Sequence, residues 1–436
     1  MSKAVQPIEI LRELIRIDTT NPPGGEAACA AYIEGLLSGA GFETALFSKE
    51  PGRPNLVARL SGRGQAPPLL FYGHMDVVTA AGQTWTYPPF EAVVKDGFVW
   101  GRGALDMKGG LAMMLAALLR AKAEGSVPAG DIIFAALADE EAGGDVGARY
   151  LVEHYPGLFQ GVRYAIGEFG GFSMRVGPTR FYPIQIAEKQ VCTLKTTLRG
   201  PAGHGSLPMR HGTMASLGRL LTRLNQTRLP HHVTPVARLM IERLAEELPL
   251  FQGLVFKNLL SPVWCGLVLK MLGPKGRTFE PLLHHTVNAT IVRGGEKFNV
   301  IPAEIELILD GRILPGYGPP DLLAELKAAV GEELEWEVIR HDPGPADPDL
   351  GLFDTLAGLM READPEGVPL PLILSGTSDA RWFSRLGIQT YGFLPMRLPD
   401  DFDFVKCIHA ADERIPAKAV EFGARVIYEL LGRYRG

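Results

Sequence analysis

Seven histidine and carboxylate side chains follow predicted strands or glycine-rich turns, where they can serve a metal site. They are His74, Asp76, Asp106, Glu140, Glu141, Glu168 and His409. Taken singly, each is as consistent with a solvated loop or a helix start as with a metal ligand. Taken together, they supply what two divalent cations need, namely one shared carboxylate, and one histidine and one glutamate for each ion. The set therefore predicts a dinuclear metal site.

The elements that must position these residues are the strands of an α/β sheet. Short apolar runs bounded by glycine and proline predict buried strands at 55–60, 69–72, 98–100, 132–137 and 164–166. Helical stretches at 109–124 and 145–154 separate some of them, so we expect an α/β fold with a mostly parallel sheet flanked by helices. His74, the pair Glu140–Glu141 and Glu168 each follow one of these strands, and ligands bind at the carboxyl ends of parallel strands.

Asp106 lies in the glycine-rich stretch Gly101–Gly110, directly before an apolar run, 111–119, that predicts a buried helix. Glycine lets the backbone approach a ligand closely, although a lone acid in this position can also be only a helix cap. Asp76 stands two residues after His74. Because side chains two apart in extended backbone point the same way, Asp76 can accept a hydrogen bond from the second ring nitrogen of His74 and fix its tautomer.

A second domain, residues 185–343, is predicted to be inserted into the first, which comprises 1–184 and 344–436. Its strand and helix patterns follow the order β-α-β-β-α-β of a ferredoxin-like α+β sandwich. The predicted elements are 191–199, 213–225, 286–292, 304–312, 321–330 and 334–341. An apolar insert at roughly 228–285 lies within this domain, and its side chains can extend the core, pack on a partner or line a pocket.

The motif Gly-Arg-Gly-x-x-Asp-x-Lys-Gly-Gly, together with the other acids and histidines in this order, resembles the dinuclear zinc aminoacylase and carboxypeptidase family. That family includes acetylornithine deacetylase, succinyl-diaminopimelate desuccinylase and glutamate carboxypeptidase. The resemblance implies that Asp106 bridges two metals and precedes a cis peptide bond to Met107. It further implies that His74 and Glu168 complete one metal site, that Glu141 and His409 complete the other, that Glu140 is the general base, and that Asp76 orients His74.

The resemblance also assigns roles in the inserted domain, which it implies is a lid and dimerisation domain. His204 resembles a histidine that donates to the tetrahedral oxyanion, usually from the partner subunit. Asn299 and Arg312 resemble ligands of the substrate carboxylate, which suits the bidentate fork of a guanidinium. The loop after the run Leu370–Leu374 resembles one that wraps the same end of the substrate, through Gly376, Thr377 and Ser378, although as bare sequence it is also consistent with a polar turn.

Composition narrows the classes of function. The chain has 436 residues, a net charge of -5 and no basic run, so we expect no nucleic-acid partner and no membrane partner. The four cysteines are scattered without Cys-x-x-Cys spacing, and residues 1–20 lack the apolar core of a signal peptide, so we expect a cytoplasmic protein.

The sequence as a whole predicts a homodimeric metallohydrolase that cleaves the amide bond of an N-acyl amino acid or of a short peptide with a free C-terminal carboxylate. Zinc is the expected metal, with cobalt or manganese as alternatives. Two other interpretations stay open. One is an amidohydrolase of the same dinuclear family acting on ureido or carbamoyl substrates, and the other is a non-catalytic metal-binding relative.

Overall fold

The structure is a computed structural model that describes residues 6–331, 334–345 and 347–436. The chain forms two compact units. Unit 1 comprises the residues up to Ile186 together with Asp349–Leu372 and Ser378–Gly436, and unit 2 comprises Ala187–Pro348 and Ile373–Thr377. The sequence predicted that the second domain is one continuous insert. In the structure, the short segment Ile373–Thr377 also belongs to unit 2.

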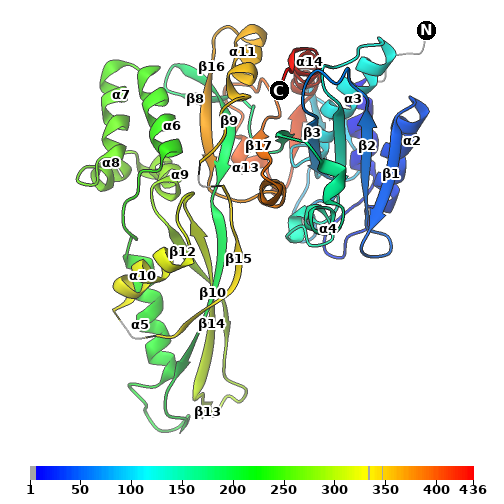
Figure 1. Cartoon of the computed structure of the whole chain (residues 1–436). Coiled ribbons are helices and arrows are strands. Elements are labelled where there is room, and N and C mark those ends of the chain that lie inside the picture. Colours follow the sequence, from blue (N-terminus) through cyan, green and yellow to red (C-terminus); the bar gives the residue numbers. More distant parts are fainter. Residues whose placement is uncertain (1–5, 332–333, 346) are drawn as a thin grey trace. The chain divides into compact units, whose positions relative to one another are not determined.

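Unit 1 is built on a nine-stranded sheet with the order β1-β2-β6-β3-β7-β17-β9-β16, and β8 pairs with β9 off this path (Figure 1). The strands are β1 (Glu43–Ser48), β2 (Pro54–Leu60), β3 (Leu69–His74), β6 (Ile132–Leu137), β7 (Tyr164–Gly167), β8 (Met174–Val176), β9 (Thr179–Glu188), β16 (Gly367–Leu374) and β17 (Gln389–Gly392). The central strands β6, β3, β7 and β17 pair in parallel, as predicted. Strands β1 and β2 on one side, and β8 and β9 on the other, pair antiparallel with their neighbours.

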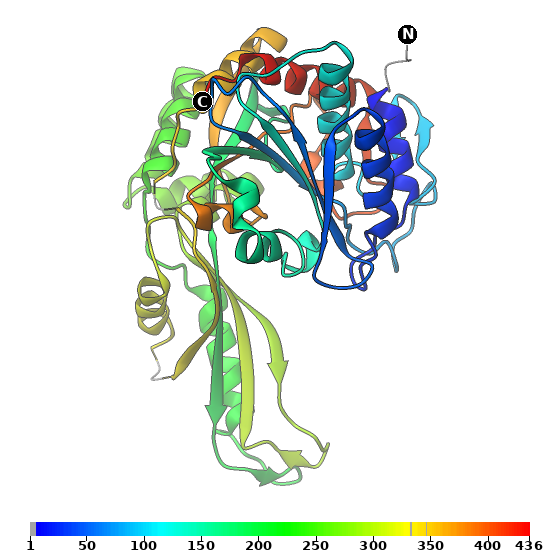
Figure 2. The same cartoon turned by 45° about the vertical axis from the view of Figure 1, so that its right-hand side comes forward.

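Helices cover both faces of this sheet (Figure 2). They are α1 (Pro7–Arg16), α2 (Ala27–Gly39), α3 (Lys108–Ala123), α4 (Ala148–His154), α11 (Phe353–Ala363), α12 (Ala380–Phe383), α13 (Phe404–Cys407) and α14 (Ala417–Arg433). On one face, α4 and α12 pack on side chains of β2, β3, β6 and β7 in a single apolar cluster. Elsewhere α3 contacts β3, and α1 and α14 pack against α3. Helix α3 is rich in Ala, Leu and Met and is buried almost all round, as its all-round apolar sequence requires.

One strand assignment from the sequence is wrong in its placement. The run Phe98–Trp100 forms β5, but this strand does not belong to the main sheet. It pairs antiparallel with β4 (Val93–Lys95) and with β18 (Arg414–Pro416) in a separate three-stranded sheet. A three-residue strand gives no periodicity that identifies its partner, and the partner β18 lies more than 300 residues away in the chain.

Unit 2 contains the predicted ferredoxin-like arrangement. Its four-stranded sheet has the order β12-β14-β10-β15, and all its pairs are antiparallel. The elements are β10 (Gln190–Arg199), α5 (Thr213–Gln226), β12 (Thr286–Arg293), β14 (Glu304–Ile313), α10 (Pro319–Val330) and β15 (Trp336–Asp342). Burial alternates along β10, and its inner residues join those of α5 and α10 in one apolar core. A short pair, β11 (Gly203–His204) and β13 (Val300–Ile301), completes the unit.

The apolar insert is helical. Its helices are α6 (Pro235–Glu246), α7 (Leu250–Lys257), α8 (Cys265–Met271) and α9 (Gly276–Phe279), with short 3-10 turns between them. Part of the insert extends the core, because Phe256, Val268 and Leu269 are buried, whereas Trp264 and Met271 are exposed. No helix in the described ranges is long and apolar enough to cross a bilayer.

Candidate dinuclear metal centre

Three parallel strands of unit 1 end at the same edge of the sheet and carry candidate ligands there. His74 is the last residue of β3, and Glu168 follows β7 directly. Glu140 and Glu141 follow β6 on a 3-10 turn, Glu140–Ala142, that begins after Asp139 in a left-handed conformation (φ +70°). The turn, rather than the alternation of a continuing strand, gives these two adjacent glutamates different directions.

Asp106 is shared between two groups of ligand atoms. Its Oδ1 lies 3.0 Å from His74 Nε2, and the same histidine nitrogen lies 3.3 Å from Glu168 Oε2. Its Oδ2 lies 3.1 Å from His409 Nε2, which in turn lies 3.3 Å from Glu141 Oε1. Each oxygen of one carboxylate therefore faces a different histidine and a different glutamate.

These spacings fit metal coordination. Two ligand atoms that each lie about 2.1 Å from a tetrahedral zinc ion are roughly 3.4 Å apart, close to the separations seen here. Glu141 Oε1 is buried, and its contact with His409 Nε2 at 3.3 Å is too long for a strong hydrogen bond, so this oxygen fits a metal ligand better than a structural carboxylate. By proximity of ligand atoms, His74 also groups with Glu140 and Glu168, and with Asp106 and Glu141. The donor set consists of imidazole and carboxylate, which suits zinc and related divalent ions.

The protonation of the site shows how strongly its charges interact. Hydrogen bonds with Asp106 and Glu141 raise the pKa of His409 to about 10. Burial, joined by the charge of Glu168, raises the pKa of Glu140 well above its ordinary value. A half-buried glutamate with a raised pKa, next to the ligands but outside both Asp106 pairs, has the character of a proton-transfer group.

The loop that carries Asp106 is held by a residue that the sequence reading did not single out. Glu413 is fully buried, and its Oε1 accepts hydrogen bonds from the backbone N–H groups of Leu105 (2.8 Å) and Asp106 (3.2 Å). Its Oε2 accepts from Gly103 N–H (3.1 Å) and from Arg102 Nη1 (2.7 Å). The peptide bond between Asp106 and the next residue is cis, as the resemblance implied. Glu413 stands four residues after His409, so the same C-terminal segment supplies a ligand and fixes the bridging loop.

Asp76 contacts His74 through its backbone and, at a longer distance, through its carboxylate. His74 Nδ1 donates to the backbone carbonyl of Asp76 at 2.9 Å, and the Asp76 carboxylate oxygen Oδ1 lies 3.5 Å from the same nitrogen. That carboxylate also accepts the backbone N–H groups of Glu140 and Glu141, both at 3.1 Å, and Asn21 Nδ2 at 2.8 Å. Asp76 therefore positions the turn that carries Glu140 and Glu141 as well as contacting His74.

A second residue missed at the sequence level is Asp379, which follows the loop predicted to wrap the substrate. It is buried, and neither of its carboxylate oxygens has a hydrogen-bond partner within the described ranges. Burial raises its pKa to about 8 against the opposing charge of Arg381, and the charge of Glu168 adds to the rise. Asp379 in turn raises the pKa of Glu140. The sequence placed it only in a polar loop, with no pattern to show that it is buried.

The candidate residues of unit 2 fall into two pairs. His204 on β11 and Asn299 beside β13 are exposed, and Gly205 N–H donates to the Asn299 carbonyl at 2.8 Å. His204 Nδ1 accepts from Ser206 N–H, so its ring proton lies on Nε2, which leaves a donor on the exposed edge.

The other pair joins Arg312 to Thr377. Arg312 Nη1 donates to Thr377 Oγ1 at 3.1 Å, while Nε and Nη2 grip the Asp310 carboxylate at 2.7 and 3.1 Å. Gly376 is half-buried, and Ser378, which falls in unit 1, is buried with its Oγ accepting from Ala380 N–H.

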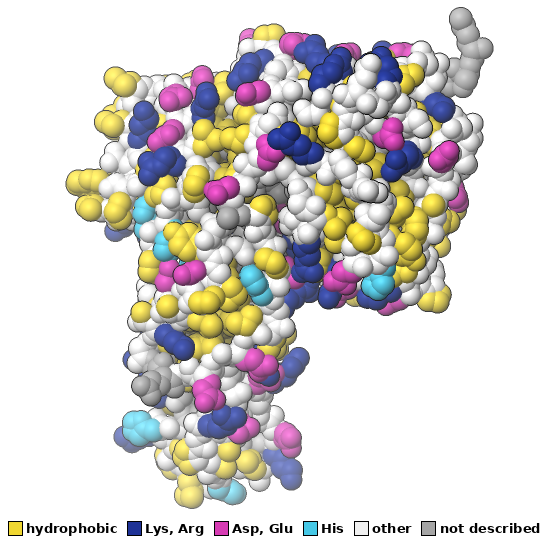
Figure 3. All heavy atoms as spheres, viewed as in Figure 1, with side chains coloured by type: hydrophobic (Ala, Val, Ile, Leu, Met, Phe, Trp, Pro, Cys, Tyr) yellow, Lys and Arg dark blue, Asp and Glu magenta, His cyan; other side chains and the backbone are white. Residues whose placement is uncertain are grey.

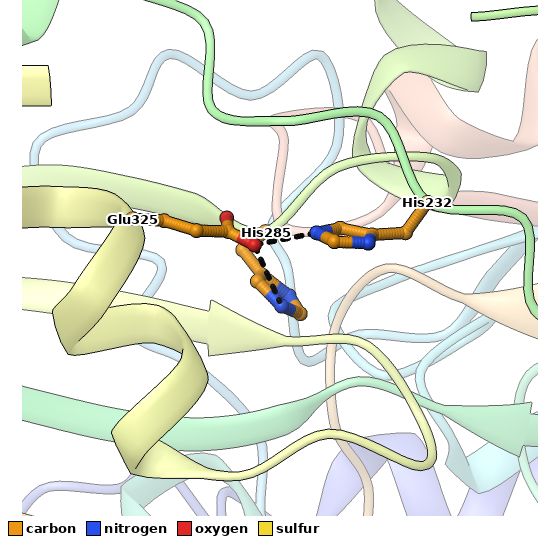
Figure 4. Close-up of side chains that lie close together, drawn as sticks. All are labelled: His232, His285 and Glu325. Atoms are coloured by element: carbon orange, nitrogen blue, oxygen red, sulfur yellow. Dashed lines mark hydrogen bonds and ion pairs between the residues drawn. The ribbon is translucent and has the colours of Figure 1, made fainter. Parts of the chain in front are cut away.

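A further histidine–glutamate group lies in unit 2, where the sequence reading assigned no function (Figure 4). Glu325 Oε1 lies 2.5 Å from His232 Nε2 and 3.8 Å from His285 Nε2. However, Leu314 N–H donates to His285 Nδ1 at 3.1 Å, so the proton of the neutral ring lies on Nε2, the nitrogen that faces Glu325. Burial lowers the pKa of His285 to about 3, and a metal bound at Nε2 would require the ring to lose its only proton. This group is therefore a structural cluster, in which His232 is hydrogen-bonded to Glu325 and His285 Nε2 has no hydrogen-bond partner among the described residues.

Comparison with known proteins agrees with the geometry of the centre in unit 1. Residues 70–433 match Peptidase family M20/M25/M40. The chain belongs to this family. A human relative, the N-fatty-acyl-amino acid synthase/hydrolase PM20D1, is 29% identical over 382 residues, which cover 84% of this chain and 73% of the relative. The succinyl-diaminopimelate desuccinylase of Paracoccus denitrificans is 27% identical over 450 residues that cover 100% of both chains.

A solved structure supports the fold of this M20 chain. The M20 family metallo-carboxypeptidase Sso-CP2 from Sulfolobus solfataricus matches with a TM-score of 0.67 at 19% identity, over 99% of both chains. Membership of the family confirms the resemblance inferred from the sequence and the predicted class of enzyme, a metal-dependent hydrolase.

Proposed function

We propose that this M20 protein hydrolyses the amide bond of N-acyl amino acids or of short peptides that end in a free carboxylate, with two zinc ions bound. The observation that carries the proposal is the Asp106 carboxylate, which presents one oxygen to each of two histidine–glutamate pairs. The names of the two relatives give their substrates as N-fatty-acyl amino acids and succinyl-diaminopimelate. Both substrates are N-acylated amino acids.

His74, Asp106 and Glu168 would hold one ion, and Asp106, Glu141 and His409 the other. Bound there, the two cations supply the acidification of a water and the polarisation of the scissile carbonyl. Glu140 takes the proton of the attacking water and returns it to the nitrogen of the leaving amine. Its raised pKa suits both steps, because a carboxylate with an ordinary pKa would hold that proton too weakly to deliver it.

The substrate carboxylate is assigned to Arg312, with Thr377 beside it. Three of the five guanidinium N–H groups are engaged by Asp310 and Thr377, which fixes the orientation of the fork and leaves two donors for a ligand. Asn299, Gly376 and Ser378 are proposed to complete this end of the substrate site.

We propose that the enzyme is a cytoplasmic homodimer, in which His204 of one subunit donates through Nε2 to the oxyanion formed in the other. The exposed edge of the ring, with its proton on Nε2, supports this role. A mass measurement in solution that finds only monomer, in a fully active sample, would contradict it.

The test of the function is a hydrolysis screen over N-acyl amino acids and dipeptides, with and without a chelator, that includes ureido substrates. We expect chelator-sensitive cleavage of N-acyl amino acids or dipeptides. Glu140→Ala should keep the metal content and abolish turnover, with the exposed Glu153→Ala as control. Cleavage only of ureido substrates, or full activity of Glu140→Ala, would refute the proposal.

A further inference from the structure

One stretch of unit 2 combines exposed apolar side chains with an absence of acids. Between Leu250 and Phe279 there are 30 residues with no Asp or Glu, in a chain that otherwise carries 49 acids and a net charge of -5. The stretch contains four cations, Lys257, Lys270, Lys275 and Arg277. Seven of the chain's 22 exposed large apolar residues in the described ranges also lie here, so both features are concentrated in one place.

Helix α7 turns its apolar side chains outward. Leu250, Phe251 and Leu254 are 92%, 76% and 60% exposed, and their spacing of three and four places them on one face of the helix. The helix packs on α6 at Gly253, where a Cβ would lie 2.3 Å from the Ala245 carbonyl oxygen, and Phe256 on the opposite side is buried. These two contacts face the rest of the unit, and the three exposed side chains face away from it.

Helix α8 repeats the arrangement. Cys265, Val268 and Leu269 are buried, while Trp264 just before the helix, Leu267 and Met271, at intervals of three and four, are exposed. Figure 3, viewed as in Figure 1, shows hydrophobic side chains at the surface where α8 lies. We call the outward side chains of α7 and α8 the apolar face; they are Leu250, Phe251, Leu254, Trp264, Leu267 and Met271. Both helices therefore bury one apolar side and expose another, which a helix that packs only within its own unit does not need.

Basic side chains border the apolar face. Lys257 lies seven residues after Leu250 and three after Leu254, on the same side of α7, and Lys270 lies three after Leu267 on α8. Lys257, Lys270 and Arg277 are exposed and form no salt bridge with any other described residue. Long basic side chains beside exposed Trp, Phe and Leu are the composition of helices that lie in a lipid interface.

We propose that the apolar face docks this protein on an anionic lipid surface, in contrast to the expectation from composition that the protein has no membrane partner. A second copy of the chain is disfavoured as the occupant, since a two-fold contact through this face would place the same cations opposite one another. An anionic lipid surface accepts the apolar side chains below the headgroups and the cations among them. The contact is peripheral, because none of the helices among the described residues could span a bilayer. Vesicle binding can be tested independently of the proposed hydrolysis, because its measurement requires no turnover.

The experiment is co-sedimentation of the full chain with vesicles of phosphatidylcholine, with and without phosphatidylglycerol. We expect binding to the anionic vesicles, weakened by salt. The variant Leu250→Gln/Leu254→Gln/Leu267→Gln should weaken binding by about 100-fold. Lys257→Gln/Lys270→Gln should weaken it by about fivefold for each lysine. The control Leu46→Gln/Val127→Gln removes side chains that are 46% and 48% exposed in unit 1 and should bind as the unmodified chain does.

Several results would overturn the proposal. They are failure to bind any vesicle, equal binding with and without phosphatidylglycerol, and unchanged binding by the triple-leucine variant. If that variant instead lowers the melting temperature or changes the oligomeric state, the apolar face is covered by protein and the proposal is wrong. Capture of an acidic protein that competes away the vesicles would likewise assign the face to a protein partner.

Discussion

Replacing Glu413 by glutamine should disturb the metal centre although this residue touches no candidate ligand side chain. Each carboxylate oxygen of Glu413 accepts two hydrogen bonds, which makes four in all. Three come from backbone N–H groups of the loop 103–106, and one comes from the Arg102 side chain. Burial raises the pKa of Glu413, but all four neighbours are donors, so a carboxyl proton would find no acceptor. The group is therefore ionised, and Glu413→Gln changes its charge and its hydrogen bonding.

The size of the effect follows from these contacts. In glutamine one oxygen becomes an amide N–H₂, which faces two donors, so two of the four hydrogen bonds are lost. Removing one partner of a buried ion pair costs about 3–5 kcal/mol. Arg102 keeps other acceptors, including the carbonyls of Ala410 and His409, so the lower end of about 3 kcal/mol applies. Because the unfolding entropy grows with chain length, the melting temperature should fall by roughly 3–5 °C.

The loop 103–106 carries the shared carboxylate, so we also expect metal affinity to fall by about 10- to 100-fold. Calorimetric titration of zinc into the metal-free protein, with thermal melts, measures both effects. Glu421→Gln, on the exposed side of α14, is the control and should change neither. Metal affinity within twofold of the unmodified protein would refute the role given to Glu413, even if the protein were less stable.

Three further predictions concern protons and positioning. Asp76→Asn should lower kcat by about 10- to 100-fold, since one oxygen that holds the Glu140 turn is lost, and unchanged kcat would contradict this positioning. Zinc must displace a proton from His409, because the pKa of this histidine is raised to about 10 in the metal-free protein. Zinc affinity should therefore rise about tenfold per pH unit between pH 6 and 8 for each proton displaced. A zinc affinity that does not change with pH would contradict this. Burial, with Arg312, lowers the pKa of Lys189 to about 7, so the unfolded chain binds more protons above that pH and stability should rise from about pH 7 to 10. Lys189→Met should flatten that rise in melting temperature, and an unchanged slope would assign it to another group.

The sequence predicted those parts of the centre that depend on buried strands. The apolar runs of β3, β6 and β7 are recognisable in the sequence as buried strands. The carboxyl ends of parallel strands meet at one edge of a sheet, so His74 and Glu168 could be predicted to lie close together. The ferredoxin-like unit was predictable for the same reason, because its strands and helices have clear periodicities. Phe98–Trp100 was misplaced because its partner is distant in the sequence.

The supporting residues could not be predicted in the same way. Glu413 and Asp76 act on backbone N–H groups, which carry no sequence signal, and the Glu413 contacts span more than 300 residues of chain. Asp379 looked like one polar residue of a loop, since burial of a single side chain depends on the packing around it. The apolar face of α7 and α8 could not be predicted either. An apolar sequence predicts that a helix packs against other elements, but it does not show which side of the helix stays exposed.

The proposal that Asp106 binds two metal ions can be tested by anomalous diffraction at the zinc edge from zinc-loaded crystals. We expect two anomalous peaks per chain. One should lie among His74, Asp106 and Glu168, and the other among His409, Asp106 and Glu141. A single peak, or two peaks of which only one contacts Asp106, would contradict it.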